Sequence, residues 1–349
     1  MTKRPENIIV GISIGDLNGI GSEVILKTFE DARMLELCTP IIFANVKILS
    51  FLKKNLELTA QLHGIDHLNQ MVIGKINVLN VWKEGVNIEY GKVDDAVGKY
   101  AVKSFVAATK ALKEGDIDVL VTAPISKSNI QSEEFSFPGH TDYLNQELEG
   151  NALMFMIQDN LRVGLLTDHV PLNEVAKHLT EDLIRTKIKT INQSLIQDFG
   201  IRKPKIAVLG LNPHSGDNGV IGDEEDKIIK PTLKKIYDEG ILVFGPFSAD
   251  GFFGNSQYEK YDAVIATYHD QGLIPFKTLS FGKGVNYTAG LNKIRTSPDH
   301  GTAYEIAGKG MADNHSFTEA VYAAIDIFNS RNEYATITEK PLKTKEKHL

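Results

Sequence analysis

Three histidines each come just after a short apolar run of the kind that forms a buried strand: His169, His214 and His269. Ligands of open parallel sheets bind beyond the carboxyl ends of the strands, where the connecting loops converge. Neutral imidazole nitrogens suit Zn²⁺ and similar divalent ions, and three protein ligands leave coordination positions open for a substrate. The repeated placement therefore predicts a shared divalent-metal site. Any one of these histidines alone would instead be read as a polar loop residue.

Each histidine also has polar neighbours that could support such a site. Asp168 precedes the first histidine, Asp270 follows the third, and Asp217 comes shortly after the second. Carboxylates can orient an imidazole ring or act as an acid or base. The same residue types form ordinary loop turns. Both interpretations stay open for Asp270, and the turn is favoured for Asp217.

Two glycine-containing segments are candidates for binding an anion. Residues 15–23 carry glycines at the start of an expected helix, where backbone N–H groups can approach a ligand. Their spacing is not that of the dinucleotide fingerprint, and Asp16 and Glu23 would repel a phosphate. The stretch from Lys277 to Arg295 interleaves basic side chains with glycines and hydroxyl groups, as phosphate recognition requires. A solvated loop is the alternative, and closeness to the third histidine favours phosphate binding.

Apolar, β-branched runs alternate with amphipathic helical patterns, which predicts an α/β protein with a largely parallel sheet. The clearest strands are expected over Ile8–Ile14, Ile41–Ala44, Ile76–Val81, Ile117–Thr122, Arg162–Thr167, Lys205–Leu209 and Ala263–Thr267. Helices are expected over Val93–Leu112, Glu181–Phe199, Glu224–Glu239 and Phe317–Phe328. Pro231 should kink the third of these helices, and Ser316 with Glu319 forms a capping-box pattern before the fourth.

Composition limits the class of protein. The chain has 349 residues, which suits two domains better than one. Its 38 basic and 45 acidic residues give a formal charge of −7, which argues against a nucleic-acid partner or an anionic membrane surface. Cys38 is the one cysteine, so an intramolecular disulfide and a cysteine metal cluster are excluded. With neither a signal-peptide pattern nor a membrane-spanning apolar run, we expect a cytoplasmic protein.

Taken together, the segments resemble the 4-hydroxythreonine-4-phosphate dehydrogenase family of pyridoxal phosphate biosynthesis. The matching motifs are Gly15-Asp16…Gly19-Ile20-Gly21, Val121-Thr122-Ala123-Pro124-Ile125-Ser126-Lys127, Gly139-His140-Thr141, Asn212-Pro213-His214, Gly245-Pro246…Ala249-Asp250, Tyr268-His269-Asp270-Gln271-Gly272-Leu273 and Gly284-Val285-Asn286…Gly290-Leu291…Ile294-Arg295-Thr296-Ser297. The segment from His300 to Gly310 is also similar to the adenine-side loop of isocitrate and isopropylmalate dehydrogenases. That wider superfamily binds NAD without the usual glycine fingerprint. Leu17, Asn18 and Ser22 depart from the residues common in the family, which leaves the shape of the first loop open.

The resemblance implies two α/β/α domains with mostly parallel sheets around a central cleft, as in isocitrate and isopropylmalate dehydrogenases. The first domain would comprise residues 1–140 and 285–335 and carry the cofactor loop. The second, residues 141–284, would carry the metal histidines and the dimer contacts. The composition of the chain end, rich in lysine and poor in apolar residues, separately predicts a mobile tail over residues 336–349. A homodimer is implied, with the active site at the subunit interface and metal ligands from both subunits.

Family roles fall on matching positions of this chain. Substrate would be bound by His140, Thr141, Lys277, Asn286 and Arg295. One divalent metal ion (Zn, Mg or Co) would be held by His169, His214 and His269. NAD or NADP would be bound by His300, Gly301, Thr302, Ala303 and Asn314. Asp250 and Asp270 are candidate proton acceptors or orienting residues of the metal site.

The implied reaction is NAD(P)- and metal-dependent oxidation of 4-phosphooxy-L-threonine at C3 to 2-amino-3-oxo-4-phosphooxybutanoate. This β-keto acid decarboxylates to 3-amino-2-oxopropyl phosphate. A 4-phospho-threonate or erythronate dehydrogenase of sugar-acid catabolism is the nearest alternative, because the motifs do not separate the two. A phosphate acyltransferase of related architecture, which needs neither nicotinamide nor metal, and a non-catalytic metabolite-binding protein are more distant alternatives.

Overall fold

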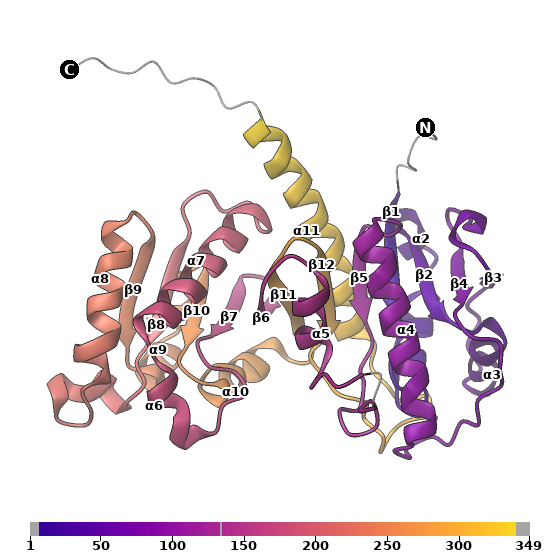
Figure 1. Cartoon of the computed structure of the whole chain (residues 1–349), viewed down its shortest axis with the longest axis horizontal. Helices are drawn as coiled ribbons and strands as arrows, with labels where there is room; N and C mark the ends of the chain where they lie inside the picture. Colours follow the sequence, from indigo (N-terminus) through magenta and orange to yellow (C-terminus); the bar gives the residue numbers. More distant parts are fainter. Residues whose placement is uncertain (1–6, 133–134, 340–349) are drawn as a thin grey trace.

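A single mixed sheet runs through the whole molecule (Figure 1). The computed structural model describes residues 7–132 and 135–339, and in these residues the strand order is β3-β4-β2-β1-β5-β12-β11-β6-β7-β10-β8-β9. The strands are β1 (Ile8–Ser13), β2 (Cys38–Ala44), β3 (Leu62–Ile65), β4 (Ile76–Asn80), β5 (Val119–Thr122), β6 (Gly150–Gln158), β7 (Leu161–Leu165), β8 (Lys205–Leu209), β9 (Leu242–Phe247), β10 (Ala263–Ala266), β11 (Val285–Leu291) and β12 (Ile294–Pro298). The helices are α1 (Gly21–Thr28), α2 (Met34–Leu37), α3 (Val46–Asn55), α4 (Asp95–Glu114), α5 (His140–Glu147), α6 (Val175–His178), α7 (Glu181–Gln197), α8 (Lys230–Asp238), α9 (Ala249–Gly254), α10 (His269–Ser280) and α11 (His315–Glu339). Short helical turns complete the fold: η1 (Leu68–Gln70), η2 (Leu172–Glu174), η3 (Pro213–Gly219), η4 (Glu225–Ile229) and η5 (Gln257–Lys260).

The expected α/β fold with a mostly parallel sheet is confirmed. The strands on either side of the centre pair in parallel, for example β1 with β2 and β5, and β10 with β7 and β8. The centre is antiparallel, because β11 pairs in that sense with both β12 and β6, and β6 pairs likewise with β7. These central strands were not expected from the sequence pattern. They join what the resemblance implied as two sheets into one.

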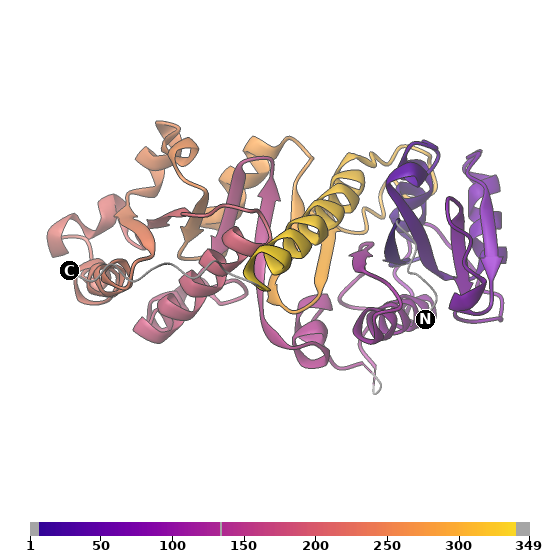
Figure 2. The same cartoon turned by 90° about the horizontal axis from the view of Figure 1, so that it is seen from above.

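Helices cover both faces of the sheet but in different ways. On one face α1, α3, α7, α8 and α11 pack over one apolar cluster that reaches from β4 to β9, with α11 crossing the centre of the molecule (Figure 2). On the other face the apolar contacts form two separate clusters, one under α4 and α5 and one under α9 and α10. Strand alternation produces this division. In β5, for example, Val119 and Val121 belong to the first face and Leu120 to the second.

Two expectations at the carboxyl end of the chain are corrected. Helix α11 begins at His315 and continues to Glu339, so residues 336–339 are helical and the expected tail cannot start at 336. Residues 340–349 of that tail lie outside the described residues. The expected capping box is also wrong, because Ser316 is inside the helix and its hydroxyl donates to the carbonyl oxygen of Gly284 at 2.7 Å. Ser316 therefore ties α11 to the start of β11, and Glu319 is free to face a cavity described below.

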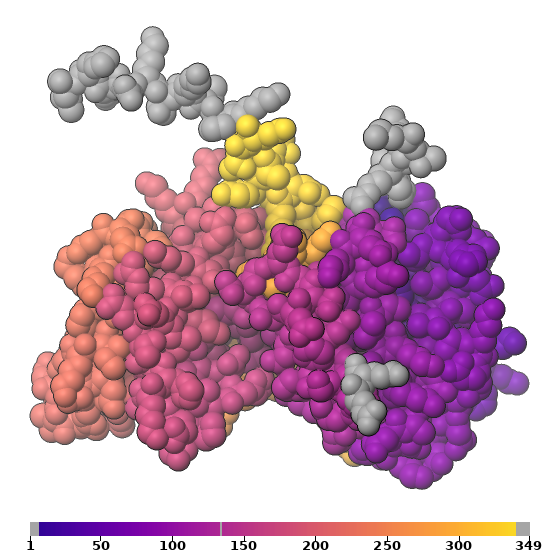
Figure 3. All heavy atoms as spheres, in the orientation of Figure 1, coloured from indigo at the N-terminus to yellow at the C-terminus, as the bar shows by residue number. Residues whose placement is uncertain are grey.

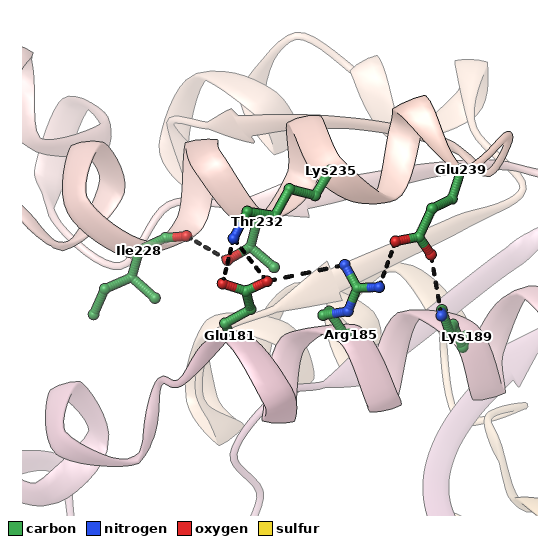
Figure 4. A network of polar contacts seen from close by, with 7 residues as sticks. All are labelled: Glu181, Arg185, Lys189, Ile228, Thr232, Lys235 and Glu239. Atoms are coloured by element: carbon green, nitrogen blue, oxygen red, sulfur yellow. Dashed lines mark hydrogen bonds and ion pairs between the residues drawn. The ribbon is translucent and has the colours of Figure 1, made fainter.

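Pro231 interrupts the expected helix over 224–239 by changing its winding. Residues Glu225–Ile229 form a π-helical turn, and α8 then starts at Lys230 with the proline in its first turn, where a missing N–H costs least. Exposed ion pairs join α7 to α8 (Figure 4), with Lys235 2.7 Å from Glu181 and Arg185 beside Glu239. Such exposed pairs contribute only about 0–1 kcal/mol each.

No helix of the described part of the chain is long and apolar enough to cross a membrane.

Candidate active site

The gap between the two apolar clusters of the second face contains a cavity of about 260 Å³. It lies at the edge of the sheet where β5 ends, and it is walled by α5, α10, β6, β11 and β12. Figure 3 shows the surface notched at this edge, between the two halves of the molecule. Six of the residues expected to bind substrate or cofactor line it: His140, Lys277, Asn286, Arg295, His300 and Gly301. We call it the substrate cavity.

Arg295 is the most unusual residue of this cavity. Its side chain projects from β12, is only 2% exposed and forms no ion pair with a carboxylate among the described residues. The guanidinium instead donates to neutral hydroxyls, from Nε to Thr122 Oγ1 at 3.0 Å and from Nη1 to Thr288 Oγ1 at 3.2 Å. Burial lowers its pKa to about 9. A buried cation without a counter-charge is costly in an empty site and becomes favourable when an anionic ligand supplies the charge.

His140, the first residue of α5, is adjacent to this guanidinium. Its Nδ1 lies 3.0 Å from Nη2 of Arg295, and because the guanidinium can only donate, Nδ1 must accept. The proton of the neutral ring is then on Nε2, which is buried and has no hydrogen-bond partner in the described structure. Burial, then the charges of Arg295 and Lys127, lower the pKa of His140 well below its ordinary value. The imidazole is therefore a neutral donor with an unused N–H.

The charge of the cavity suits an anion. Its lining residues include the cations Arg295, Lys277 and Lys127 and one carboxylate, Asp299. Lys277 Nζ lies 3.3 Å from the backbone carbonyl of Asp299, which is a long contact that a stronger acceptor would replace. Asn286 has a buried Oδ1 without a partner among the described residues. Unused donors and acceptors beside three cations are what a small phosphorylated, polar ligand needs.

The other expected cofactor and substrate residues do not line this cavity. Thr141 is one position further along α5, and Asn314 donates to Thr28 Oγ1 and Thr318 Oγ1 at 3.2 Å, which anchors α1 to α11. The carbonyl of Thr302 accepts from Ile20 N at 3.0 Å. Ala303, next in the chain, adopts a positive φ of 43°.

Asp16 explains how the loop expected to bind the cofactor is held. Its carboxylate is fully buried and accepts from Asn18 N at 2.8 Å, Asn129 Nδ2 at 2.7 Å and the hydroxyl of Tyr304 at 2.8 Å. The sequence pattern indicated that Asp16 would repel a phosphate. In the structure this carboxylate instead accepts hydrogen bonds that join the loop around Tyr304 to the end of β1. The first glycine segment therefore supports the expected cofactor loop from behind.

The three histidines do not form a metal site within one chain. The rings of His169 and His269 lie 5.9 Å apart between centroids, whereas His214 lines a separate cavity of about 320 Å³ together with Asp250. No group of three His, Cys, Asp or Glu residues in the described ranges is close enough to hold a metal ion. His269 does have the support that a ligand imidazole usually has, because its Nδ1 lies 2.7 Å from Asp270 Oδ1 and Nε2 remains available.

The two expected catalytic carboxylates are placed differently. Asp270 is bound to the ring of His269, which is an orienting position. Asp250 accepts from the hydroxyl of Ser248 at 2.5 Å, and this bond, the N–H of Gly251 and the nearby His214 lower its pKa. Asp250 is therefore ionised at neutral pH. It faces His214 rather than the substrate cavity.

Strained backbone marks the second cavity. Five consecutive residues of η3, from His214 to Asn218, have φ between 43° and 79°, and only Gly216 among them adopts such values without cost. Non-glycine residues in this region cost about 1 kcal/mol or more each, and they cluster at functional sites. In this conformation His214 lines the second cavity together with Asp250.

Several site residues were not singled out from the sequence. Thr122 and Thr288 hold Arg295, and Lys127 adds charge, yet each is unremarkable in its own segment. Thr122 and Lys127 fall within the quoted 121–127 motif, which was the available signal. Lys283, in the basic stretch expected to bind phosphate, lines a different cavity instead.

Comparison with known proteins assigns the family. Residues 36–324 match the family model described as Pyridoxal phosphate biosynthetic protein PdxA. The chain is 48% identical to 4-hydroxythreonine-4-phosphate dehydrogenase of Bacteroides thetaiotaomicron, over 96% of this chain and 93% of that protein. It is 36% identical to a relative from Oceanobacillus iheyensis named for D-threonate 4-phosphate dehydrogenase activity, over 94% of this chain and 99% of the relative. The crystal structure of 4-hydroxythreonine-4-phosphate dehydrogenase from Klebsiella pneumoniae superposes with a TM-score of 0.80 at 31% identity, covering 93% and 99% of the two chains. The chain belongs to the PdxA family.

Proposed function

We propose that this PdxA-family chain is a 4-hydroxythreonine-4-phosphate dehydrogenase, an oxidoreductase of pyridoxal phosphate biosynthesis. It oxidises the C3 hydroxyl of 4-phosphooxy-L-threonine to 2-amino-3-oxo-4-phosphooxybutanoate. This product is a β-keto acid, and it loses CO₂ to give 3-amino-2-oxopropyl phosphate. The shared family and the 48% identical relative support this activity.

The observation that carries the proposal is the buried Arg295 that lacks a carboxylate partner among the described residues. Four groups can donate hydrogen bonds to a phosphate or carboxylate in this cavity. They are the guanidinium of Arg295, the unused Nε2–H of His140 and the ammonium groups of Lys127 and Lys277. Thr122 and Thr288 keep the guanidinium in place before the ligand arrives. Such preorganisation places the substrate without further side-chain ordering.

The residues fit the cofactor that a dehydrogenase requires. His300 and Gly301 line the same cavity as Arg295, and the Nε2 atom of His300 is buried without a partner in the described structure. We propose that the loop from His300 to Ala303, held by Asp16, binds NAD or NADP beside the substrate, with Asn314 anchoring its far end. When bound, the nicotinamide accepts the hydride and a divalent ion polarises the C3 hydroxyl.

The metal site is proposed to form only in a homodimer. His169 and His269 lie beside each other and His269 is oriented by Asp270, so the donor chemistry fits Zn²⁺ or Co²⁺ better than Mg²⁺, which prefers oxygen ligands. A third imidazole has to come from a second copy, because His214 of the same chain lies in another cavity. In that arrangement Asp270 is a positioning residue. Asp250, ionised beside His214, is the candidate proton acceptor.

The domain assignment and location remain parts of the proposal. Two domains of residues 1–140 with 285–335 and of residues 141–284 would meet between β11 and β6, at the substrate cavity. A cytoplasmic location belongs to the same proposal. Cys38 is buried, and burial raises the pKa of its thiol to about 12, which makes the thiol unreactive.

One relative favours a second candidate, the oxidation of 4-phospho-D-threonate, whose C2 group is a hydroxyl instead of an amine. An assay of NADH formation with both substrates, with and without a chelator, separates the candidates. We expect kcat/KM for 4-phosphooxy-L-threonine to exceed that for 4-phospho-D-threonate by at least about 100-fold, and chelation to remove both activities. A preference for the threonate, or full activity after exhaustive chelation, would refute the corresponding part of the proposal.

A further inference from the structure

A second cavity, of about 300 Å³, lies under α11 on the opposite face of the sheet from the substrate cavity. We call it the α11 cavity. In the β6–β11 register, Asn286 pairs with Met156 and Val285 with Ile157. Side chains alternate along strands, so the first pair faces the substrate cavity and the second pair lines the α11 cavity. The sheet separates the two cavities, and the α11 cavity is not part of the site already described.

Arg162, at the start of β7, gives the α11 cavity a partly buried cation that forms no ion pair in the described residues. The guanidinium stacks on the ring of Phe199 at 4.6 Å and forms no ion pair with a carboxylate in the described residues. Its Nη1 reaches the backbone carbonyls of Asn160 and Asp262 only at 3.4 Å, and its buried Nε has no partner there. Burial lowers the pKa of Arg162, and the nearby carboxylate of Asp262 offsets part of this effect. Such a group is stabilised by a ligand that brings an anionic fork acceptor.

Glu319 and Asp326 give the same cavity two carboxylates that have no ion-pair partner in the described residues. They lie two turns apart on the face of α11 that lines the cavity, and neither forms an ion pair in the described part of the chain. Burial raises the pKa of both carboxyls, and Asp159 raises that of Glu319 further while Lys283 lowers it. A ligand cation at this face would remove that cost.

The charge balance excludes simpler ligands. The lining residues include two cations, Arg162 and Lys283, and four carboxylates: Asp159, Asp198, Glu319 and Asp326. One of these carboxylates, Asp198, already pairs with Arg331 at 2.6 Å, which leaves two cations and three carboxylates. A phosphate or a dianion would be repelled by the three carboxylates, and a simple amine would leave the buried Nε of Arg162 without an acceptor. The lining also includes the polar residues Gln158, Tyr322 and Ser330 and the apolar side chains of Ile157, Phe199, Val285, Ala323 and Ile327.

We propose that the α11 cavity binds a small zwitterion of the α-amino-acid class. Its carboxylate pairs with Arg162, its ammonium group meets Glu319 and Asp326, and an apolar side chain packs on the Ile157 and Phe199 side. The site is separate from catalysis, so its test needs neither NAD nor turnover.

The experiment measures binding of each standard L-amino acid to the full-length protein, first by thermal shift and then by calorimetry. We expect at least one apolar amino acid to bind with a Kd below about 1 mM, and Arg162→Gln and Glu319→Gln each to weaken it about tenfold. Arg202→Gln, at an exposed arginine outside the cavity, is the matched control and should leave Kd unchanged. The Glu319→Gln substitution keeps the shape and volume of the side chain and lies on a surface helix. This variant therefore still tests ligand binding if Arg162→Gln fails to fold.

Analogues of the best ligand identify which group each residue meets. The carboxamide of this ligand, which lacks the negative charge, should bind the wild type about tenfold more weakly than the amino acid does. Its affinity should then be the same for Arg162→Gln as for the wild type. The deaminated acid, which lacks the ammonium group, should likewise bind the wild type more weakly and should have the same affinity for Glu319→Gln as for the wild type. If no amino acid binds at about 10 mM, or if the binding that is found is unchanged in both variants, the proposal is wrong.

Discussion

The buried charge of Arg295 lowers the stability of the empty protein and favours binding of an anionic ligand. It is buried among the hydroxyls of Thr122 and Thr288 and beside His140, and without ligand its charge is not neutralised by any described carboxylate. Binding sites often contain groups that destabilise the empty protein. The substrate cavity is of this kind.

Replacing Arg295 by glutamine should therefore leave the empty protein no less stable. A glutamine amide can still donate to Thr122, while the cost of the buried charge disappears. We expect the free energy of unfolding in urea to stay equal or to rise by about 1 kcal/mol. A loss above about 2 kcal/mol would mean that Arg295 is mainly structural.

His140 should produce a pH dependence of stability. Its folded pKa lies below the ordinary value of 6.5, so below that pH the unfolded chain binds more protons than the folded one and stability falls as pH falls. Urea unfolding at pH 7.5 and pH 5.0 measures the effect. We expect the wild type to lose up to about 2 kcal/mol more than His140→Gln over this interval, since one proton contributes at most about 1.4 kcal/mol per pH unit. Equal losses in both proteins would show that His140 is not held neutral.

At the scale of elements, the loop after β12 depends on a contact with the loop after β1. Tyr304 donates to the buried Asp16 carboxylate at 2.8 Å, and the neighbouring residue Thr302 accepts from Ile20 N. We expect Tyr304→Phe to lower the free energy of unfolding by about 1–2 kcal/mol, because a bond to a buried charge is lost.

The same variant tests the cofactor loop. Steady-state kinetics of Tyr304→Phe should show KM for NAD about five- to tenfold higher, with KM for the phosphorylated substrate within about twofold, because only the loop is loosened. Tyr237→Phe, at a largely exposed tyrosine of α8, is the control and should change neither constant. Equal increases in both KM values would indicate that this loop does not bind the cofactor.

Strongly periodic elements could be predicted from the sequence, and contact-dependent ones could not. The strand before His269 and the helix over Glu181–Gln197 have clear apolar periods and were found where expected. Strands β6, β11 and β12 were missed. Residues 285–298, which form β11 and β12, mix glycines, hydroxyls and charges and become strands only through pairing across the centre of the sheet. Strand β6 contains an apolar run over residues 152–157, and such a short run does not by itself distinguish a buried strand from a buried helix. The false capping box has a similar cause, since the Ser316 hydroxyl is used by Gly284.

The candidate site shows the same limit. His140, Asn286 and Arg295 were found through motifs and do line one cavity. The convergence of the three histidines stays a prediction. Hydrophobic periodicity and residue spacing within one chain do not indicate which side chains come together between two chains. Thr122 could not be identified as a site residue from the sequence, since its role depends on a hydrogen bond from Arg295, which is 173 residues away in the sequence.

At the scale of the molecule, an apolar surface on α10 supports the dimer. Ile274 is 63% exposed and Phe281, just after the helix, is 85% exposed, and α10 begins at His269. Exposed large apolar side chains beside an incomplete site indicate a protein interface. We therefore expect α10 to lie in the interface between two copies.

Changing Ile274 to glutamate should separate the copies. Sedimentation should show the wild type as a dimer and Ile274→Glu as a monomer with native circular dichroism, and turnover should fall at least about 100-fold because the metal site is lost. Leu37→Glu, at a partly exposed leucine of α2, should leave the dimer and the activity intact. A fully active Ile274→Glu monomer would show that one chain suffices.

The central claim is that Arg295 binds the anionic substrate and not the cofactor, and KM values of Arg295→Gln test it most directly. With 4-phosphooxy-L-threonine and NAD varied in turn, we predict KM for the phosphorylated substrate to rise at least about 100-fold and KM for NAD to change by less than about threefold. Increases of similar size in both constants, or no increase for the phosphorylated substrate, would contradict the account.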